Sequence, residues 1–352
     1  MNILLAAKRK IIQTIIFFMC ISIISSAQTV EKSFTINSDT LKRINEYLRN
    51  GEYGKISGIV ILSKSKILYE QYYGFNNPST LHPISSVTKS ITSLITGICL
   101  DKGYLNSIDT PIWRFFPEYK SIFERDTIKK TITIRNLLNQ TTGLQWDEWT
   151  THYSYAGNAL IELSQSSQNW VEYTLNLNIE CKPSVKFSYN SGNSQIIKEI
   201  LCKVSSHDFE WLVKNYLFEP LGIKDYHWDT YISNGIPAWG GLSLTTRDMA
   251  RFGTLVCNHG CWNDCQIISN DWLEKSMTVE SKNAKVGYGL HWWITTQPDG
   301  KPLIYAAGYG DQFIYIAPDK KIVIAINGQN FTDYKWPRSI DNLIQNIFAS
   351  IQ

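Results

Sequence analysis

A strongly apolar stretch runs from Ser86 to Cys99 and begins with the polar residues Ser86, Thr88 and Lys89. Pro83 and Ser85 just upstream are typical of a helix start, and Gly103 is typical of a helix end. Apolar residues recur through the segment at helical spacing, namely Val87, Ile91, Leu94, Ile95 and Ile98. The pattern predicts a buried helix that begins near Ser86 and ends near Gly103.

Alternating apolar and polar positions predict strands towards both ends of the chain. The predicted strands are Gly58 to Ser63 and Ile67 to Gly74 around the Lys64-Ser65 turn, then Leu303 to Ala307, Phe313 to Ala317 and Ile322 to Asn327. Helical patterns cover Asp39 to Arg49, Ile196 to Val204, Trp336 to Ile351 and, with long polar loops, most of Asp109 to Trp228. We therefore expect an α/β (α+β) fold in which both termini build one antiparallel sheet around a mostly helical insert. Ser86 would lie where the two parts meet, a common position for ligand sites.

The N-terminus has the pattern of an export signal. Residues 8–10 are basic, residues 11–24 are apolar, and the small residues 25–27 resemble a cleavage site before Gln28. We expect residues 1–27 to be a signal peptide and the mature protein to be periplasmic or secreted. Cys20 offers a lipoprotein alternative, which the bulky residues 17–19 disfavour. No second long apolar segment follows, so no stable membrane span is expected after removal of the signal.

Charge and cysteine usage exclude several function classes. The net charge is only +3 and the basic residues are scattered, so no nucleic-acid partner is expected. Cys257, Cys261 and Cys265 are evenly spaced without a Cys-x-x-Cys pair or nearby histidines, which disfavours zinc. Cys261 and Cys265 flank a predicted turn and are either a disulfide pair or small buried residues. We expect no metal and no cofactor.

Ser86 and Lys89 form an S-x-x-K motif at the start of the predicted helix. Residues three apart share a helical face, so the Lys89 ammonium can lie beside the Ser86 hydroxyl. The first turn also carries the positive end of the helix dipole, which favours a developing alkoxide. Together these effects can activate a serine nucleophile without a histidine. The alternative is a capping serine with a solvated lysine, because S-x-x-K occurs by chance in many chains.

A second polar motif, Phe187 to Asn193, leads into the predicted helix from Ile196 to Val204. Tyr189 and Ser191 are two residues apart and could present both side chains to one pocket. Beside Lys89, the phenol of Tyr189 would have a lowered pKa and could accept a proton. The alternative is a loop tyrosine whose ring packs and whose hydroxyl faces water.

The third motif lies at the end of the first C-terminal strand, where Gly308 and Gly310 flank Tyr309. Glycine in a strand often marks the close approach of a ligand or of another backbone. An edge strand there could offer a backbone N–H to an oxyanion and pair with an extended substrate. The alternative is a simple hairpin turn.

In this order, the S-x-x-K motif, the Tyr-x-Ser motif and the glycine-bearing strand resemble the serine β-lactamase and penicillin-binding-protein superfamily. The pattern is most similar to class C β-lactamases, their esterase relatives and the aminohexanoate-dimer (nylon-oligomer) hydrolases. The resemblance extends from about Ile56 to Ile351 and includes segments 134–144, 239–253 and 287–292. It implies a β-lactamase/transpeptidase-like domain over 28–352, with an α/β part at 28–85 and 235–352 and a mostly helical part at 86–234.

The resemblance also implies a role for each motif residue. Ser86 would be the acylated nucleophile, and Lys89 would hold the proton network. Tyr189 would be the general base and would pass the proton to the leaving group. Ser191 would hydrogen-bond Lys89 or the substrate. The backbone N–H groups of Ser86 and Tyr309 would form the oxyanion hole.

Two departures from the family pattern bear on the substrate. Relatives that recognise a substrate carboxylate usually carry Lys or His at the start of the third motif, where this chain has Ala306. A methyl group cannot donate to a carboxylate, so good recognition of β-lactams or D-Ala-D-Ala is not expected. Ser191 in place of Asn also favours a resemblance to the nylon-oligomer hydrolases.

The loop after Gly143 is rich in aromatic residues that could surround an apolar group of the substrate. These residues are Trp146, Trp149, Tyr153 and Tyr155. The predicted substrate-binding residues are therefore Trp146, Tyr153, Gly308 and Gly310. The alternative for the aromatic residues is packing beneath the helical region. Three carboxylates could meet a substrate amine, but we expect them to be solvated loop residues: Asp147, Glu148 and Asp311.

The sequence thus predicts an exported, metal-independent serine hydrolase that cleaves an amide or ester of a small-molecule or short peptide-like substrate. The G-x-S-x-G motif of an α/β-hydrolase and the H-E-x-x-H motif of a metallo-hydrolase are both absent from the sequence. The alternative is a penicillin-binding or sensor protein of the same fold that is acylated but does not turn over.

Overall fold

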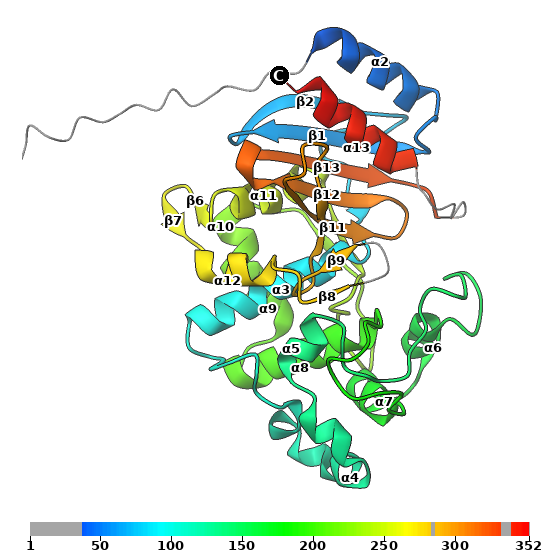
Figure 1. Cartoon of the computed structure of the whole chain (residues 1–352), viewed down its shortest axis with the longest axis vertical. Helices are drawn as coiled ribbons and strands as arrows, with labels where there is room; N and C mark the ends of the chain where they lie inside the picture. The colour runs from blue at the N-terminus through cyan, green and yellow to red at the C-terminus, as the bar shows by residue number, and fades with distance from the viewer. Residues whose placement is uncertain (1–36, 283–285, 332–338, 352) are drawn as a thin grey trace, which may run out of the picture. The chain divides into compact units, whose positions relative to one another are not determined.

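A large antiparallel sheet forms the centre of the structure (Figure 1). The computed structural model describes residues 37–282, 286–331 and 339–351, which belong to one compact unit. The predicted signal peptide, residues 1–27, lies outside these residues. Within them the sheet has eight strands in the order β2 (Lys66–Tyr72), β1 (Ile56–Ser63), β13 (Ile322–Gly328), β12 (Gln312–Ala317), β11 (Pro302–Gly308), β10 (Trp293–Thr296), β9 (Gly287–Tyr288) and β8 (Ser281–Lys282).

The two ends of the chain meet between β1 and β13, as the sequence predicts. Ile59 pairs with Ile326 and Ile61 with Ile324, and both strands are buried along their whole length. Strands covered on both faces are expected to be continuously apolar, as these are. The β1–β2 connection is a two-residue turn at 64–65 in which both residues have positive φ, the geometry that fits the twist of a hairpin.

Helices cover both faces of the sheet. On one face, α11 (Thr246–Cys257) packs against β12 and β13, and α3 (Val87–Asp101) lies beside β11. Gly253 permits this approach, because a Cβ there would lie 2.4 Å from a methyl carbon of Val323. On the other face, α2 (Ser38–Arg49) and α13 (Ser339–Ser350) pack against each other (Figure 1). The first residues of the predicted C-terminal helix, 336–338, lie outside the described residues.

A mostly helical region connects α3 to the C-terminal strands. Its elements are η1 (Ile112–Phe115), η2 (Pro117–Tyr119), α4 (Lys120–Arg125), η3 (Thr127–Thr131), α5 (Ile134–Leu138), α6 (Ala159–Gln165), α7 (Trp170–Asn176), α8 (Ser191–Ser205), α9 (Phe209–Val213), η4 (Lys214–Phe218) and α10 (Glu219–Leu221). Helix α8 packs against α3, α5 and α7, so the region is built on the buried helix that carries the S-x-x-K motif. The predicted architecture is therefore confirmed: a sheet from both termini with helices on its faces and a helical insert.

Short elements complete the described fold. A small sheet combines β3 (His82–Pro83), β5 (Leu242–Leu244) and β4 (His227–Trp228). The remaining elements are a hairpin of β6 (Cys261–Trp262) and β7 (Cys265–Gln266), the helix α12 (Asn270–Ser276) and the turn η5 (Pro318–Lys320). No helix among the described residues is long and apolar enough to cross a bilayer.

The β6–β7 hairpin answers the question left open by Cys261 and Cys265. The turn between them forms as predicted, but both thiols are free. Cys261 pairs across the hairpin with Gln266, and its thiol lies 2.9 Å from the side-chain oxygen of that residue. Cys265 pairs with Trp262, and neighbouring residues of a strand point to opposite faces. The two thiols therefore lie on opposite faces of the hairpin, where a disulfide would require the strands to rearrange.

Candidate active site

The first turn of α3 brings Ser86 and Lys89 into direct contact. Ser86 stands at the N-cap position of the helix without a capping hydrogen bond from its side chain, and Lys89 lies one turn further on the same face. The Lys89 ammonium nitrogen, Nζ, lies 2.9 Å from Ser86 Oγ and 3.4 Å from the backbone oxygen of Trp239. Only 1% of the Lys89 surface is exposed. The structure therefore excludes a solvated lysine at this position.

Burial changes the acid–base behaviour of Lys89. Removal from water disfavours the charged ammonium and lowers the pKa of Lys89 to about 8, while the negative charge of Glu148 opposes this shift. A lysine with such a pKa is partly neutral near pH 8, and a neutral amine can accept a proton from a serine hydroxyl. Burial, together with the positive charge of Lys89, lowers the pKa of His291 to about 3. His291 is therefore neutral at physiological pH.

Tyr189 lies against Lys89 at the start of α8. The centre of its ring is 4.7 Å from Lys89 Nζ, and the residue is 8% exposed. Asn190, the next residue, caps α8 by accepting a hydrogen bond from the backbone of Gly192, so the helix start fixes the approach of the tyrosine. The ring stacks on Trp149 at 5.3 Å and on Trp293 at 5.7 Å between ring centres. The predicted serine, lysine and tyrosine are thus brought together from distant parts of the chain.

The end of β11 lies against the backbone that leads into α3. A Cβ at Gly308 would be 2.2 Å from the backbone oxygen of Ile84, so only glycine allows this approach. Ser85 donates a hydrogen bond from Oγ to the backbone oxygen of Tyr309 at 3.1 Å. Ser85 itself has φ +49°, a left-handed conformation that is unusual for serine and is often found at functional sites. The two residues predicted to form the oxyanion hole, Ser86 and Tyr309, are therefore held on adjoining backbone segments.

The loop after Gly143, together with Phe331, contacts the side chain of Tyr309. Its hydroxyl contacts the Nε2 atom of His152 at 3.0 Å and the backbone oxygen of Phe331, and its ring centre lies 4.9 Å from that of Tyr153. Gly310 has φ +86°, and a Cβ there would meet the Phe331 ring. The predicted substrate-binding residues Gly308, Gly310 and Tyr153 thus shape the end of β11 beside Ser86.

Glu148 corrects the expectation of solvated loop carboxylates. It is 2% exposed and accepts hydrogen bonds from Ser191, through both Oγ at 2.7 Å and the backbone N–H at 3.0 Å. The indole of Trp146 donates to it at 3.0 Å and the hydroxyl of Tyr153 at 3.2 Å. Asp311 is buried as well and accepts from Asn330 at 2.7 Å, whereas Asp147 is exposed as expected.

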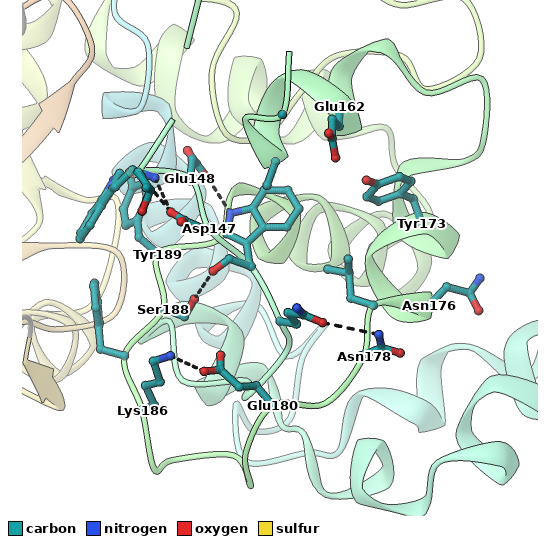
Figure 2. Close-up of a pocket in the computed structure, with 18 of the residues that line it drawn as sticks. Asp147, Glu148, Glu162, Tyr173, Asn176, Asn178, Glu180, Lys186, Ser188 and Tyr189 are labelled. Carbon is teal, nitrogen blue, oxygen red and sulfur yellow. Dashed lines mark hydrogen bonds and ion pairs between the residues drawn. The ribbon is translucent and has the colours of Figure 1, made fainter. Parts of the chain in front are cut away.

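A pocket of about 860 Å³ opens next to Tyr189 (Figure 2). Glu148 and Ser188 line it near Tyr189, whereas Tyr173 and Glu162 lie at its far end. Tyr155 lies outside this lining, and its side chain is 65% exposed. Of the predicted catalytic residues, Tyr189 lines this pocket, whereas Ser86, Lys89 and Ser191 are not among its lining residues.

Sequence reasoning missed three contributors to the site: Glu148 as a buried group, the Trp239 carbonyl that accepts from Lys89, and Trp293 beside Tyr189. The sequence held no signal for Glu148: residues 145–149 alternate between exposed and buried in the structure, but Asp147 and Glu148 are both acidic and Trp149 is exposed. That alternation places Glu148 on the same buried side as Trp146. Trp239 acts through its backbone, which no side-chain pattern can reveal.

Comparison with known proteins agrees with this geometry. A profile of the Beta-lactamase family matches residues 51–335. The 6-aminohexanoate-dimer hydrolase of Paenarthrobacter ureafaciens is 22% identical over 280 residues, which cover 75% of this chain and 70% of that protein. The fold matches D-alanine carboxypeptidase AmpC from Burkholderia cenocepacia with a TM-score of 0.67 at 16% identity, over 89% of this chain and 98% of that one. It also matches an octameric penicillin-binding protein homologue from Pyrococcus abyssi with a TM-score of 0.66 at 21% identity, over 86% and 76% of the two chains. The chain therefore belongs to the beta-lactamase family and is an enzyme of the serine hydrolase type with that family's fold.

Proposed function

We propose that this protein is an exported hydrolase that cleaves an ester or amide through an acyl-enzyme on Ser86. The observation that carries the proposal is the 2.9 Å contact between Ser86 Oγ and a lysine amine that is 1% exposed. Burial lowers the pKa of Lys89 to about 8, so the neutral amine is available as a base in the neutral to mildly alkaline range. The export pattern of residues 1–27 supports action outside the cytoplasm.

In the proposed acylation step, Ser86 Oγ attacks the carbonyl carbon and its proton passes to the Lys89 amine. The carbonyl oxygen gains negative charge, and the backbone N–H groups of Ser86 and Tyr309 bind it. When the intermediate collapses, the bond to the leaving alcohol or amine breaks. In this proposal the leaving group takes a proton from Lys89 through the phenol of Tyr189, whose ring centre lies 4.7 Å from the amine nitrogen. In deacylation, water attacks the carbonyl carbon of the acyl-enzyme and its proton passes through Tyr189 to Lys89. The bond to Ser86 Oγ then breaks, Oγ takes the proton from Lys89, and the acid is released.

Labelling with a fluorophosphonate combined with an ester assay tests the proposal. We expect the probe to modify Ser86, identified by mass spectrometry of the labelled peptide, and to abolish release of p-nitrophenol from a short-chain p-nitrophenyl ester. Activity should persist in the presence of a chelator, because no step requires a metal. Labelling of Ser86 without ester or amide turnover would contradict the proposal and indicate a protein that is acylated but does not hydrolyse.

The third motif determines which substrates we expect. Ala306 is fully buried and its methyl group offers no charge to a substrate carboxylate. The surfaces near Tyr189 are aromatic instead, from Trp149 and Trp293, and therefore suit an apolar acyl or leaving group.

We predict that kcat/KM falls in the order of short p-nitrophenyl esters, uncharged or amine-bearing short amides, and penicillins. The ester-to-penicillin ratio should exceed about 100, because a charge-assisted contact to the penicillin carboxylate would be missing. A panel of p-nitrophenyl esters, aminohexanoate dimers, D-amino-acid peptides and nitrocefin measures it, with the labelled enzyme as blank. Nitrocefin turnover as efficient as ester turnover would show that another cation binds the carboxylate and would refute this order.

A further inference from the structure

Glu148 is a buried carboxylate with a complete set of donors. An ionised carboxylate in a protein interior is costly unless hydrogen bonds or a nearby cation compensate it. Four donors from three residues point at Glu148: the Ser191 backbone N–H and hydroxyl, the Trp146 indole and the Tyr153 hydroxyl, at distances from 2.7 to 3.2 Å. The indole and the backbone N–H can only donate and both point at Oε2, which is therefore an acceptor, while the two hydroxyls lie against Oε1.

The donors also connect Glu148 to the reacting groups. Ser191 is the first residue of α8 and lies two positions after Tyr189, so bonds to Ser191 fix the helix start that carries the tyrosine. Because the Ser191 hydroxyl directs its hydrogen to Glu148, only its lone pairs remain for another partner. Ser191 therefore acts as an acceptor, in contrast to an asparagine side chain, which can also donate.

Glu148 is also the negative charge that acts on Lys89. Two other buried groups of the site, Tyr288 and His291, are uncharged near neutral pH. The Tyr189 ring lies 4.7 Å from Lys89 Nζ, burial holds the pKa of Tyr288 well above its usual value, and the pKa of His291 is lowered to about 3. The ionisation of Lys89 should therefore depend on Glu148 more than on any of these neighbours.

We propose that Glu148 is a positioning residue of the active site, which orients Ser191 and supplies the buried negative charge beside Lys89. This inference rests on the proposed function, since its readout is the reaction of Ser86. In this role the negative charge of Glu148 favours the protonated form of Lys89. Without that charge the amine would remain neutral to lower pH, and the α8 start would lose two hydrogen bonds.

The test is the pH dependence of kcat/KM for a p-nitrophenyl ester in the full-length mature enzyme. The wild type should show an inflection near pH 8, the value to which burial lowers the pKa of Lys89. In Glu148→Gln we expect the inflection to move down by about one pH unit, as for loss of a nearby buried charge. We also expect kcat to fall about tenfold or more because Ser191 is released. Glu148→Asp keeps the charge, so its inflection should stay near the wild-type value while kcat still falls.

Glu124→Gln is the matched control, because it converts an exposed carboxylate, in an ion pair with Lys120, to an amide. It should leave both the inflection and kcat unchanged. An unmoved inflection in Glu148→Gln, with or without a slower rate, would overturn the proposal. If Glu148→Gln does not fold, as judged by circular dichroism, the aspartate variant decides, and wild-type kcat in that variant would also overturn it. If the wild-type enzyme is neither labelled at Ser86 nor active, the proposed function itself is wrong. That result differs from an active wild type whose inflection does not move in Glu148→Gln.

Discussion

Replacing Ser86 with alanine should abolish turnover and covalent labelling together. The hydroxyl is the part of the residue that contacts the Lys89 amine, so the variant removes the nucleophile and leaves its base in place. Loss of a serine nucleophile in hydrolases lowers kcat by about a million-fold, and residual activity of at most about 10⁻⁴ of wild type is expected here. Stopped assays with a p-nitrophenyl ester, corrected for hydrolysis in buffer, measure the loss.

Ser85 provides the matched control for this variant. It is the adjacent serine and donates its hydroxyl to the Tyr309 backbone rather than to Lys89. Ser85→Ala should therefore keep fluorophosphonate labelling and lower kcat/KM by no more than about tenfold, the effect of one lost neutral hydrogen bond. Turnover by Ser86→Ala within about tenfold of wild type would remove Ser86 from the mechanism. Equal losses in the two serine variants would show that the helix start, and not one hydroxyl, is needed.

The parts of the fold that the sequence predicted are those with strong local patterns. The β1–β2 hairpin and strands β11, β12 and β13 have the apolar pattern of strands, and turn residues or polar segments separate them. Both signals therefore indicate the same elements. Helix α3 was equally clear because its apolar residues recur at helical spacing. In contrast, β8 and β9 are two residues long and β10 is four, too short for any periodicity to appear. These strands, of which β8 is the edge of the sheet, form because a neighbouring strand offers unpaired backbone groups, which is a tertiary effect.

The site was predictable to the extent that its residues belong to motifs. Ser86 and Lys89 are three apart on one helix, so their contact follows from helix geometry. The position of Tyr189 depends on how α8 packs against α3, which local sequence does not determine. Glu148 was misjudged because a carboxylate in a polar loop is usually solvated, and its burial depends on donors from residues 146, 153 and 191 that only the folded chain assembles.

Lys89→Ala should lower kcat/KM by more than about 100-fold, the scale of a lost general base. The variant removes the proton acceptor, Lys89 Nζ, that lies 2.9 Å from Ser86 Oγ. The inflection near pH 8 should disappear, because it reports the protonation of this amine. Lys89→Arg separates charge from basicity, since arginine keeps the positive charge but does not lose its proton in this range. We expect Lys89→Arg to be as slow as Lys89→Ala, as measured by ester hydrolysis from pH 6 to 10. An arginine variant within about tenfold of wild type would mean that the lysine acts by its charge alone and that Tyr189 is the base for Ser86.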